Sequence, residues 1–459
     1  MSNTKDMTVG SPAKLIFFFA LPLMLGNVFQ QLYTMVDTAV VGQFVGVEGL
    51  AALGAADWMV YMIWGVATGF TQGFSILISQ RWGAADHQGL RKSIAMSVYL
   101  CAGIVLILSA VSQLIAYPAL RLLNTPENIR AGALTYMRIR FAGVITITFY
   151  NMCASVLRAL GDSKTPLVAM IVSSGVNIAL DLLFVVGFHW GIAGAAVATV
   201  TAEACAGILC LIAIRRVPVL RFRREDWTPD RTVLGKLFLL GLPMSFQNIV
   251  IGGGGLVVQR VINGFGFLFV AGITATNKLY GILDVAASSF GFSVATFAGQ
   301  NLGANKLDRI RQGTRSALKI CLGLSLVISS ATILLGRYVL RLFISDSAAD
   351  VEAVLGYAYD FLFVMSVGLC FLYTLFVYRS ALQGMGDTFI PMVSGMLELA
   401  ARISCVLLLP RFVEEYGVYL SEVAAWFCAM VLLIAAYYWR IHRLSRKAAE
   451  ALPEAPAEE

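Results

Sequence analysis

The sequence predicts an all-α polytopic membrane protein with twelve transmembrane helices arranged as two pseudo-symmetric six-helix lobes. The first supporting observation is composition, because 58% of the 459 residues are hydrophobic and only 13% are charged. A soluble domain carries about 25% charged residues, so lipid rather than water must surround most of this chain. The second observation is a series of apolar runs long enough to cross a bilayer, and the third is an internal repeat.

The repeat consists of two motifs that each occur twice. The apolar run after Leu21-Pro22 ends in a Gly-Ala turn at 80–84, and the run after Leu242-Pro243 ends in a matching turn at 300–304. Further along, 158–162 and 383–387 both end in Gly-Asp and precede a proline at the same spacing. This order indicates tandem duplication of one membrane unit. Duplicated halves are typical of proteins that work by alternating access, with a substrate handled between the halves.

The individual spans follow from run length, since a helix needs roughly 20 apolar residues to cross a bilayer. Six predicted spans lie on each side of the most polar interior stretch. They cover about 14–42, 51–80, 93–118, 133–159, 166–187 and 191–214, then 235–262, 269–298, 314–336, 355–382, 389–410 and 417–440. We therefore expect lobes at 1–214 and 235–445, a linker at 215–234, and a disordered polar tail at 446–459.

Positive charges are distributed unevenly between the loops. One set of loops carries most of the Lys and Arg residues, including Arg379 and the arginine-rich stretch from Arg215 to Arg231. The alternate loops hold only a few, namely Arg121, Arg130, Arg337, Arg341 and Arg411. The positive-inside rule makes the first set cytoplasmic and places both termini on that side. The formal charge of +7 thus reflects membrane topology, and we expect no nucleic-acid partner.

Signatures of soluble catalysis are missing from the sequence. The eight cysteines lie within apolar segments and form no CxxC motif, so we expect small core residues rather than disulfides or metal ligands. The three histidines stand alone, and the Gly-Asp-Ser-Lys-Thr segment at 161–165 lacks the spacing of a nucleotide-binding loop. We therefore predict that the protein is not an enzyme, has no cofactor and does not use ATP directly.

Two acids inside predicted spans carry the functional prediction, because a charge at bilayer depth costs at least about 2.5–3.5 kcal/mol. Asp37 and Asp181 each follow a proline, Pro22 and Pro166, by fifteen residues on helices that run in the same direction. Equal rise along the two helices places both carboxylates at similar depth. Asn177 lies one turn before Asp181 and shares its helix face.

Neighbouring polar residues extend this set. Thr199 and Glu203 share a face of the next helix, and Gln30 lies two turns before Asp37. Carboxylate, amide and hydroxyl oxygens suit a hard cation such as Na+, and they can equally hold a proton. The sequence therefore predicts a site for H+ or Na+ around Asp37 and Asp181, with oxygens of these neighbouring polar residues close by. The alternative for Asp181 is a helix-end residue that interfacial water satisfies.

Other buried features have mainly structural interpretations. Pro22 removes a backbone hydrogen bond inside the first span and is expected to kink that helix. Glu398 and Arg402 lie i,i+4 on one helix and are expected to pair. Three further charges, Arg260, Lys278 and Asp284, are expected to compensate one another between adjacent helices; the alternative is that Arg260 and Lys278 line a cavity.

In this order, the motifs resemble the MATE (multidrug and toxic compound extrusion) family over essentially the whole chain. They are Leu21-Pro22, Gln30-Gln31, Asp37–Gly42, the Gln80 and Gln300 turns, Arg158–Asp162 and Asn177–Asp181. The resemblance implies two six-helix lobes around a central cavity, and export of amphipathic, often cationic, drug-like compounds driven by inward H+ or Na+. It also implies a monomer in contact with membrane lipid in the bacterial cytoplasmic membrane.

The resemblance is greatest to the DinF-like branch, in which the ion site lies in the amino-terminal lobe. It implies ion ligands at Asp37, Asn177, Asp181 and Thr199, with Tyr136 and Asn151 as neighbours and Gln30 near the cavity. The NorM-like branch has an acid on the seventh helix, whereas the matching region of this chain, 247–253, begins with Gln247-Asn248 and contains no acid. The alternative function is a flippase for lipids or lipid-linked oligosaccharides of the same superfamily. A strongly cationic cavity containing Arg260 and Lys278 would favour it.

Overall fold

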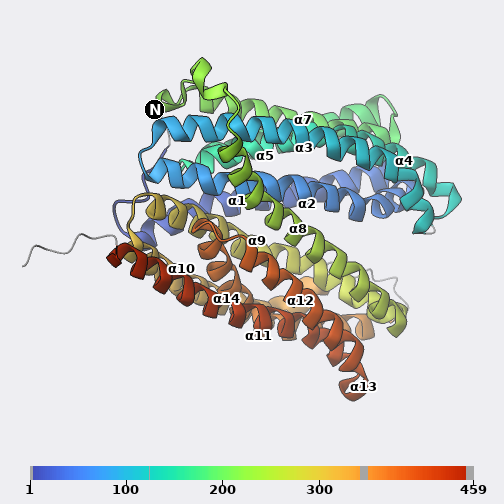
Figure 1. Ribbon diagram of the computed structural model, residues 1–459. Coiled ribbons are helices and arrows are strands. Elements are labelled where there is room, and N and C mark those ends of the chain that lie inside the picture. Colours follow the sequence, from blue (N-terminus) through green and yellow to red (C-terminus); the bar gives the residue numbers. More distant parts are fainter. Residues whose placement is uncertain (1–3, 124, 342–349, 451–459) are drawn as a thin grey trace, which may run out of the picture.

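The computed structural model describes residues 4–123, 125–341 and 350–450, and within these ranges the chain is helical with no strands (Figure 1). Eleven described helices are long and apolar enough to cross a membrane, and a bent pair, α4 and α5, supplies a twelfth span if counted as one. The predicted all-α polytopic fold is therefore confirmed.

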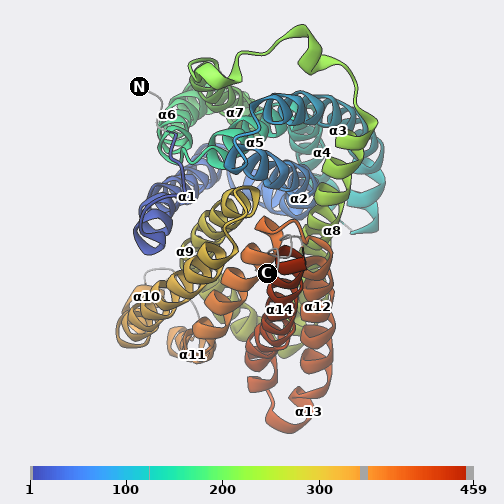
Figure 2. The same ribbon diagram turned by 60° about the vertical axis from the view of Figure 1, so that its left-hand side comes forward.

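The helices fall into two bundles that follow one another in the sequence (Figures 1 and 2). The first contains α1 (Pro12–Phe44), α2 (Val47–Gly83), α3 (His87–Leu122), α4 (Glu127–Ala142), α5 (Val144–Ala159), α6 (Lys164–Asp181), the π-helix η1 (Leu182–Gly187) and α7 (Gly191–Arg215). The second contains α8 (Arg231–Ile262), η4 (Asn263–Phe265), α9 (Phe267–Gly303), α10 (Leu307–Arg341), α11 (Val351–Gly384), α12 (Phe389–Leu408), α13 (Pro410–Val413) and α14 (Tyr416–Glu450).

The fourth predicted span, 133–159, is broken in the middle. α4 and α5 meet at Gly143 with an angle of 43° between them. A methyl carbon placed on Gly143 would lie 2.3 Å from a side-chain carbon of Val200 on α7. Glycine therefore allows close approach of α7 at the bend, and this contact is invisible in the hydropathy of the span.

The first helix of each repeat passes from one lobe to the other. The start of α1 packs into the core of the second lobe through Phe19 and Leu23, whereas Val41 near its end packs into the first lobe. α8 does the reverse, since Leu237 packs in the first lobe and Ile262 in the second. Pro22 and Pro243 lie inside these helices. Each lobe is thus held to the other by a helix that both share.

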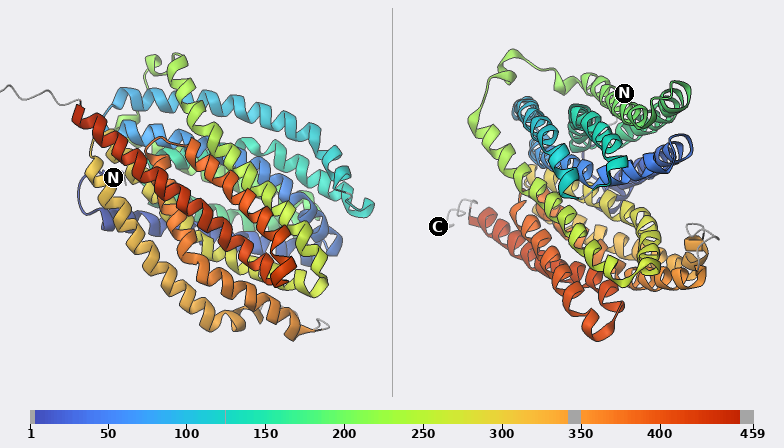
Figure 3. Two further views of the ribbon diagram at one scale, coloured as in Figure 1. Left: turned by 60° about the horizontal axis from the view of Figure 1, so that its bottom comes forward. Right: turned by 90° about the vertical axis from the view of Figure 1, so that its right-hand side faces the viewer.

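The duplicated Gly-Ala turns contact each other directly. A methyl carbon on Gly83 would lie 1.9 Å from the carbonyl oxygen of Gln300, and one on Gly303 would lie 1.9 Å from that of Gln80. The Gln80 side chain donates to the carbonyl of Gly384 at 3.0 Å, and the Gln300 side chain donates to that of Ala159 at 2.8 Å. The lobes are therefore closed at this end and diverge toward α4 and α13 (Figures 1 and 3).

The linker and the tail differ in detail from the predicted boundaries. α8 begins at Arg231, inside the expected linker 215–234, because Asp230 caps its first turn by accepting from the amides of Thr232 and Val233. The linker also contains two short 3-10 helices, η2 (Pro218–Leu220) and η3 (Arg224–Trp227). α14 continues to Glu450, where an ion pair with Arg446 spans one turn at 2.9 Å, so this part of the tail is helical. Residues 451–459 of the expected disordered tail lie outside the described part.

Candidate ion and substrate sites

The four predicted ion ligands come from three packed helices of the first lobe. Asp37 lies on α1, Asn177 and Asp181 lie on α6, and Thr199 lies on α7. All four side chains are buried, with exposed fractions of 7%, 1%, 0% and 7% in that order. The interpretation of Asp181 as a water-exposed helix end is therefore wrong, because the packing of α7 against α6 covers it.

Several buried polar atoms here lack partners. No hydrogen bond reaches Oδ1 of Asp37, either carboxylate oxygen of Asp181, or the amide oxygen and nitrogen of Asn177. Asp181 also lies within electrostatic range of Asp37. Buried polar groups in folded proteins are nearly always satisfied, so this cluster calls for a proton or a cation. These oxygen ligands fit either ion.

The backbone changes its winding directly after Asp181. α6 ends at this residue, and η1 continues from Leu182 to Gly187 with π-helical hydrogen bonding. Single-turn π segments inside α-helices frequently mark functional sites, because they re-aim side chains and carry strain. Sequence reasoning missed this feature, since the apolar run 166–187 continues across the change without a break.

The predicted neighbours have different roles. Tyr136 is buried on α4 and lies within electrostatic range of Asp37. Asn151 is buried on α5 but donates to the hydroxyl of Thr68 on α2 at 3.3 Å. Gln30 is half-buried on α1, two turns before Asp37. Tyr136 is thus the predicted neighbour that lies within electrostatic range of an ion ligand.

Glu203 is not available as a free ligand. Its Oε1 accepts from Nη1 of Arg140 at 3.0 Å, and its Oε2 accepts from the Thr146 hydroxyl at 3.3 Å. Both side chains of the ion pair are close to nine-tenths buried. Sequence reasoning missed Arg140, although it falls inside the predicted span 133–159. Arg140 also lies within electrostatic range of Asp37, so the ion pair borders the ion ligands.

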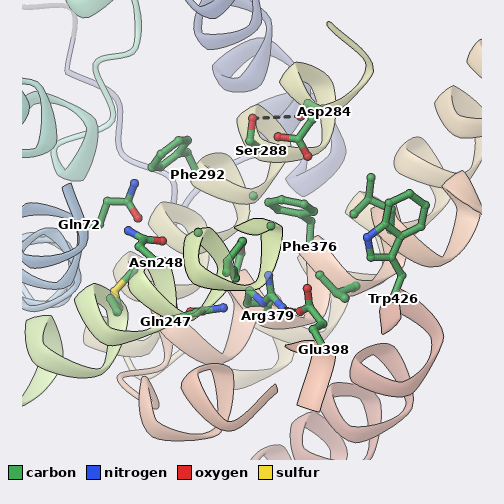
Figure 4. A pocket seen from close by; sticks show the side chains of 18 of the residues that line it. Gln72, Gln247, Asn248, Asp284, Ser288, Phe292, Phe376, Arg379, Glu398 and Trp426 are labelled. Atoms are coloured by element: carbon green, nitrogen blue, oxygen red, sulfur yellow. Dashed lines mark hydrogen bonds and ion pairs between the residues drawn. The ribbon is translucent and has the colours of Figure 1, made fainter. Parts of the chain in front are cut away.

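A cavity of about 750 Å³ lies between α2 and the second lobe (Figure 4). Its walls come from α2, α8, α9, α11, α12 and α14. Gln247 and Asn248, the polar pair on the seventh predicted span, both line it. Aromatic rings supply much of the apolar lining, including Trp58, Phe292 and Trp426. The cavity is distinct from the carboxylate cluster of the first lobe, which contributes none of its lining residues.

The charge pairs of the cavity differ from the expected ones. Glu398 on α12 pairs with Arg379 on α11, and Arg402 pairs with Glu422 on α14 at 2.7 Å. The expected pairing of Glu398 with Arg402 is wrong because each side chain faces a different neighbouring helix. The assignment of Arg379 to a loop is also wrong, since it is 7% exposed within α11.

The expected group of Arg260, Lys278 and Asp284 does not form. Arg260 and Lys278 are exposed and neither lines the cavity. Asp284 on α9 does line it, and its electrostatic partner is Arg379. Because Arg379 is held by Glu398, Asp284 has no ion pair of its own among the described residues. Figure 4 places Asp284 and Ser288 on the opposite wall from Glu398.

Comparison with known proteins gives the family. The MatE family model matches residues 22–183 and 243–405, which covers most of both lobes. The chain belongs to the MatE family. Both matched segments begin at the prolines of the crossing helices α1 and α8, so the MatE unit is the repeat found in the sequence. MatE proteins are transporters, and this chain is therefore a multi-pass membrane transporter and not an enzyme.

Individual relatives and solved structures agree with this assignment. The chain is 32% identical to the probable multidrug resistance protein YpnP of Bacillus subtilis, over 75% of this chain and 77% of that protein. It is 21% identical to the multidrug export protein MepA of Staphylococcus aureus over 93% of this chain and 94% of that one.

Among solved structures, a MOP superfamily transporter from Pyrococcus furiosus superposes with a TM-score of 0.91 at 22% identity, covering 97% of this chain and all of that one. The outward-facing conformation of a multidrug resistance MATE transporter of the MOP superfamily gives 0.88 at 23% identity, covering 97% and 99%. These two likenesses establish that the MatE fold is shared.

Proposed function

We propose that this MatE transporter exports amphipathic organic cations in exchange for H+ or Na+. The observation that carries the proposal is the unpartnered carboxylate cluster of Asp37 and Asp181, buried apart from the large cavity. An intramembrane acid without a partner costs several kcal/mol unless it binds an ion during the transport cycle. The names of the relatives, which include probable multidrug resistance and multidrug export proteins, support the same class of substrate.

The cavity supports a cationic substrate through its charge. Four acids line it, Asp57, Asp284, Glu398 and Glu422, against two arginines, Arg379 and Arg402, so its formal charge is −2 when all are ionised. Both arginines are already paired, which leaves Asp57 and Asp284 to balance the charge of a ligand. Aromatic rings beside these acids suit a flat organic cation. A volume of about 750 Å³ falls within the range of small-molecule sites.

Coupling would pass through α1. Asp37 lies in the half of α1 that belongs to the first lobe, whereas the other half packs into the core of the second lobe. A proton or Na+ at Asp37 and Asp181 neutralises the cluster and lets α1 settle against α6 and α7. The movement, with a kink at Pro22, is transmitted to the second lobe and changes the exposure of the cavity.

The contact between the Gln80 and Gln300 turns would close the transporter on the cytoplasmic side, which the positive charges identify. The cavity would then open outward in this conformation, with both termini in the cytoplasm. We place the transporter in the cytoplasmic membrane of a bacterium, acting as a monomer, and assign its ion site to the DinF-like pattern. The bacterial relatives support the location.

A flippase is less well supported. It would need a strongly cationic cavity for the phosphate groups of a lipid-linked substrate. Arg260 and Lys278, the residues that kept this alternative open, lie outside the lining, and the cavity arginines are neutralised by Glu398 and Glu422. The acids Asp57 and Asp284 would repel a phosphate further.

The test is transport of a fluorescent cationic dye in everted membrane vesicles. Wild type, Asp37→Asn and Glu127→Gln are compared under an imposed pH gradient and, separately, an imposed Na+ gradient. Glu127 is the matched control because its side chain is 91% exposed on α4. We expect one gradient to drive dye movement in wild type and Glu127→Gln and not in Asp37→Asn. Undiminished movement in Asp37→Asn, with equal protein in the membrane, would overturn the proposed coupling site.

A further inference from the structure

A second pocket lies at the end of the second lobe where α10 begins and α14 ends. Its volume is about 400 Å³, and eight residues of α10, α11 and α14 line it: Arg311, Thr314, Arg315, Tyr378, Tyr437, Tyr438, Ile441 and His442. Two arginines and no carboxylate stand among these lining residues. The pocket is separate from the substrate cavity and from the carboxylate cluster of the first lobe, and transport as proposed above does not use it.

The pocket holds polar groups without a partner. Tyr437 is 3% exposed, and its hydroxyl lies beside the Thr314 side chain without a hydrogen bond of standard geometry. Arg315 is exposed and makes no hydrogen bond or ion pair among the described residues. Arg311 is anchored by Asp308 at 3.1 Å and by the hydroxyl of Ser445 at 2.7 Å, which fixes its guanidinium at the rim. A free cation, an anchored cation and a buried hydroxyl donor therefore converge on one space.

The internal repeat shows what is missing from this place. Gln80 and Gln300 are 220 residues apart, and the same offset relates Arg91 on α3 to Arg311 on α10. In the first lobe, Arg91 donates to Asp226 of the linker at 3.0 Å, and the Tyr99 hydroxyl donates to the carbonyl of Trp227. The linker thus supplies an acid that covers the basic end of α3.

The second lobe has no such cover among the described residues. The position equivalent to Arg315 is Ala95, which is fully buried in the core of the first lobe. A core alanine in one repeat is thus replaced by an exposed arginine in the other, so this charge is not required by the fold. It adds positive potential at the place where the first lobe has its own carboxylate.

The surroundings match the surface of a bilayer. Tyr438 and Trp439 on α14 are 53% and 55% exposed, and the Arg443 guanidinium lies over the Trp439 ring at 5.4 Å from its centroid. Exposed Tyr and Trp beside arginine are typical of the interface between headgroups and acyl chains. Basic pockets between transmembrane helices on the cytoplasmic side bind acidic lipid headgroups.

We propose that this pocket binds the headgroup of an anionic phospholipid from the leaflet on this side of the membrane. The phosphate would accept from Arg315, from the free side of Arg311 and from the Tyr437 hydroxyl, and it would complete the basic end of α10 as Asp226 completes that of α3. Arginine suits this role because its planar guanidinium donates two parallel hydrogen bonds to a phosphate.

The test is native mass spectrometry of the full chain released from detergent micelles containing phosphatidylglycerol or phosphatidylcholine. Wild type is compared with Arg315→Gln, Tyr437→Phe and the control Arg215→Gln. Arg215 is an exposed arginine at the end of α7 in the other lobe, and its substitution by Gln removes the same positive charge as Arg315→Gln. Thermal unfolding in lipid-free detergent checks that every variant is folded.

We expect wild type to retain phosphatidylglycerol in preference to phosphatidylcholine. Arg315→Gln and Tyr437→Phe should each weaken phosphatidylglycerol binding about fivefold, and Arg215→Gln should leave it unchanged. Equal losses in Arg315→Gln and Arg215→Gln would indicate general attraction to charge and overturn the site. Displacement of the lipid by millimolar inorganic phosphate would also overturn it, because the ligand would then be free phosphate.

Discussion

The contact between the two Gly-Ala turns makes a sharp prediction about conformational balance. In Gly303→Ala, the added methyl carbon would lie 1.9 Å from the carbonyl oxygen of Gln80, whereas ordinary contacts begin at 3.4 Å. The α2 turn must therefore withdraw by about 1.5 Å, and the next nearest atoms are also backbone, so no side-chain rotation relieves the clash. Overpacking of this kind costs about 1–3 kcal/mol. The cost applies only while the turns touch, so the population with this end open should rise roughly fivefold to hundredfold.

Thiol labelling measures this population. Ser75 lines the substrate cavity, and Ser75→Cys can be placed in a background whose eight native cysteines are replaced. A membrane-impermeant maleimide, added from the face that carries the two turns, should label it faster when Gly303→Ala is present. Gly323→Ala is the matched control, because a methyl carbon there meets nothing within 4 Å. Equal labelling rates in the two glycine variants would refute the idea that this contact is the gate.

Three further predictions concern polar and charged side chains inside the spans. Arg140→Gln should lower the free energy of unfolding in detergent by about 3–5 kcal/mol, because it leaves the Glu203 carboxylate buried without its ion-pair partner. Adding Glu203→Gln should restore most of this free energy. A double variant no more stable than Arg140→Gln would contradict the prediction. Asn177→Leu should abolish ion-driven dye efflux without lowering the unfolding temperature, since its amide makes no hydrogen bond to lose; a large drop in that temperature would indicate a structural role. Asp284→Asn should weaken binding of a cationic dye about tenfold, measured by fluorescence titration, and leave binding of a neutral dye unchanged.

The crossing of α1 and α8 between lobes bears on how such a transporter moves. A helix that belongs to one core over its first half and to the other core over its second half cannot follow either lobe as a whole. Relative motion of the lobes must therefore bend or shift these two helices. Pro22 and Pro243 lie inside them, where a missing backbone hydrogen bond lowers the cost of bending.

The sequence by itself determined the fold class and the repeat, because both depend on local properties. Apolar runs of bilayer length form helices wherever they occur, and two copies of one pattern fold alike. Helical periodicity also correctly placed Asn177 and Asp181 on one helix face. The free-energy cost of a charge at bilayer depth singled out Asp37. The burial of all three in the structure follows from the same preference.

Only the tertiary structure decided which charges pair. Glu398 and Arg402 share one helix face, yet each pairs with a different helix, and Glu203 pairs with Arg140, which no sequence pattern singles out. The break at Gly143 and the π-helix after Asp181 likewise arise from packing against neighbouring helices. Periodicity specifies the neighbours of a residue along its own helix. Partners across helices depend on which helices are adjacent and how they cross, and a single helix does not encode that.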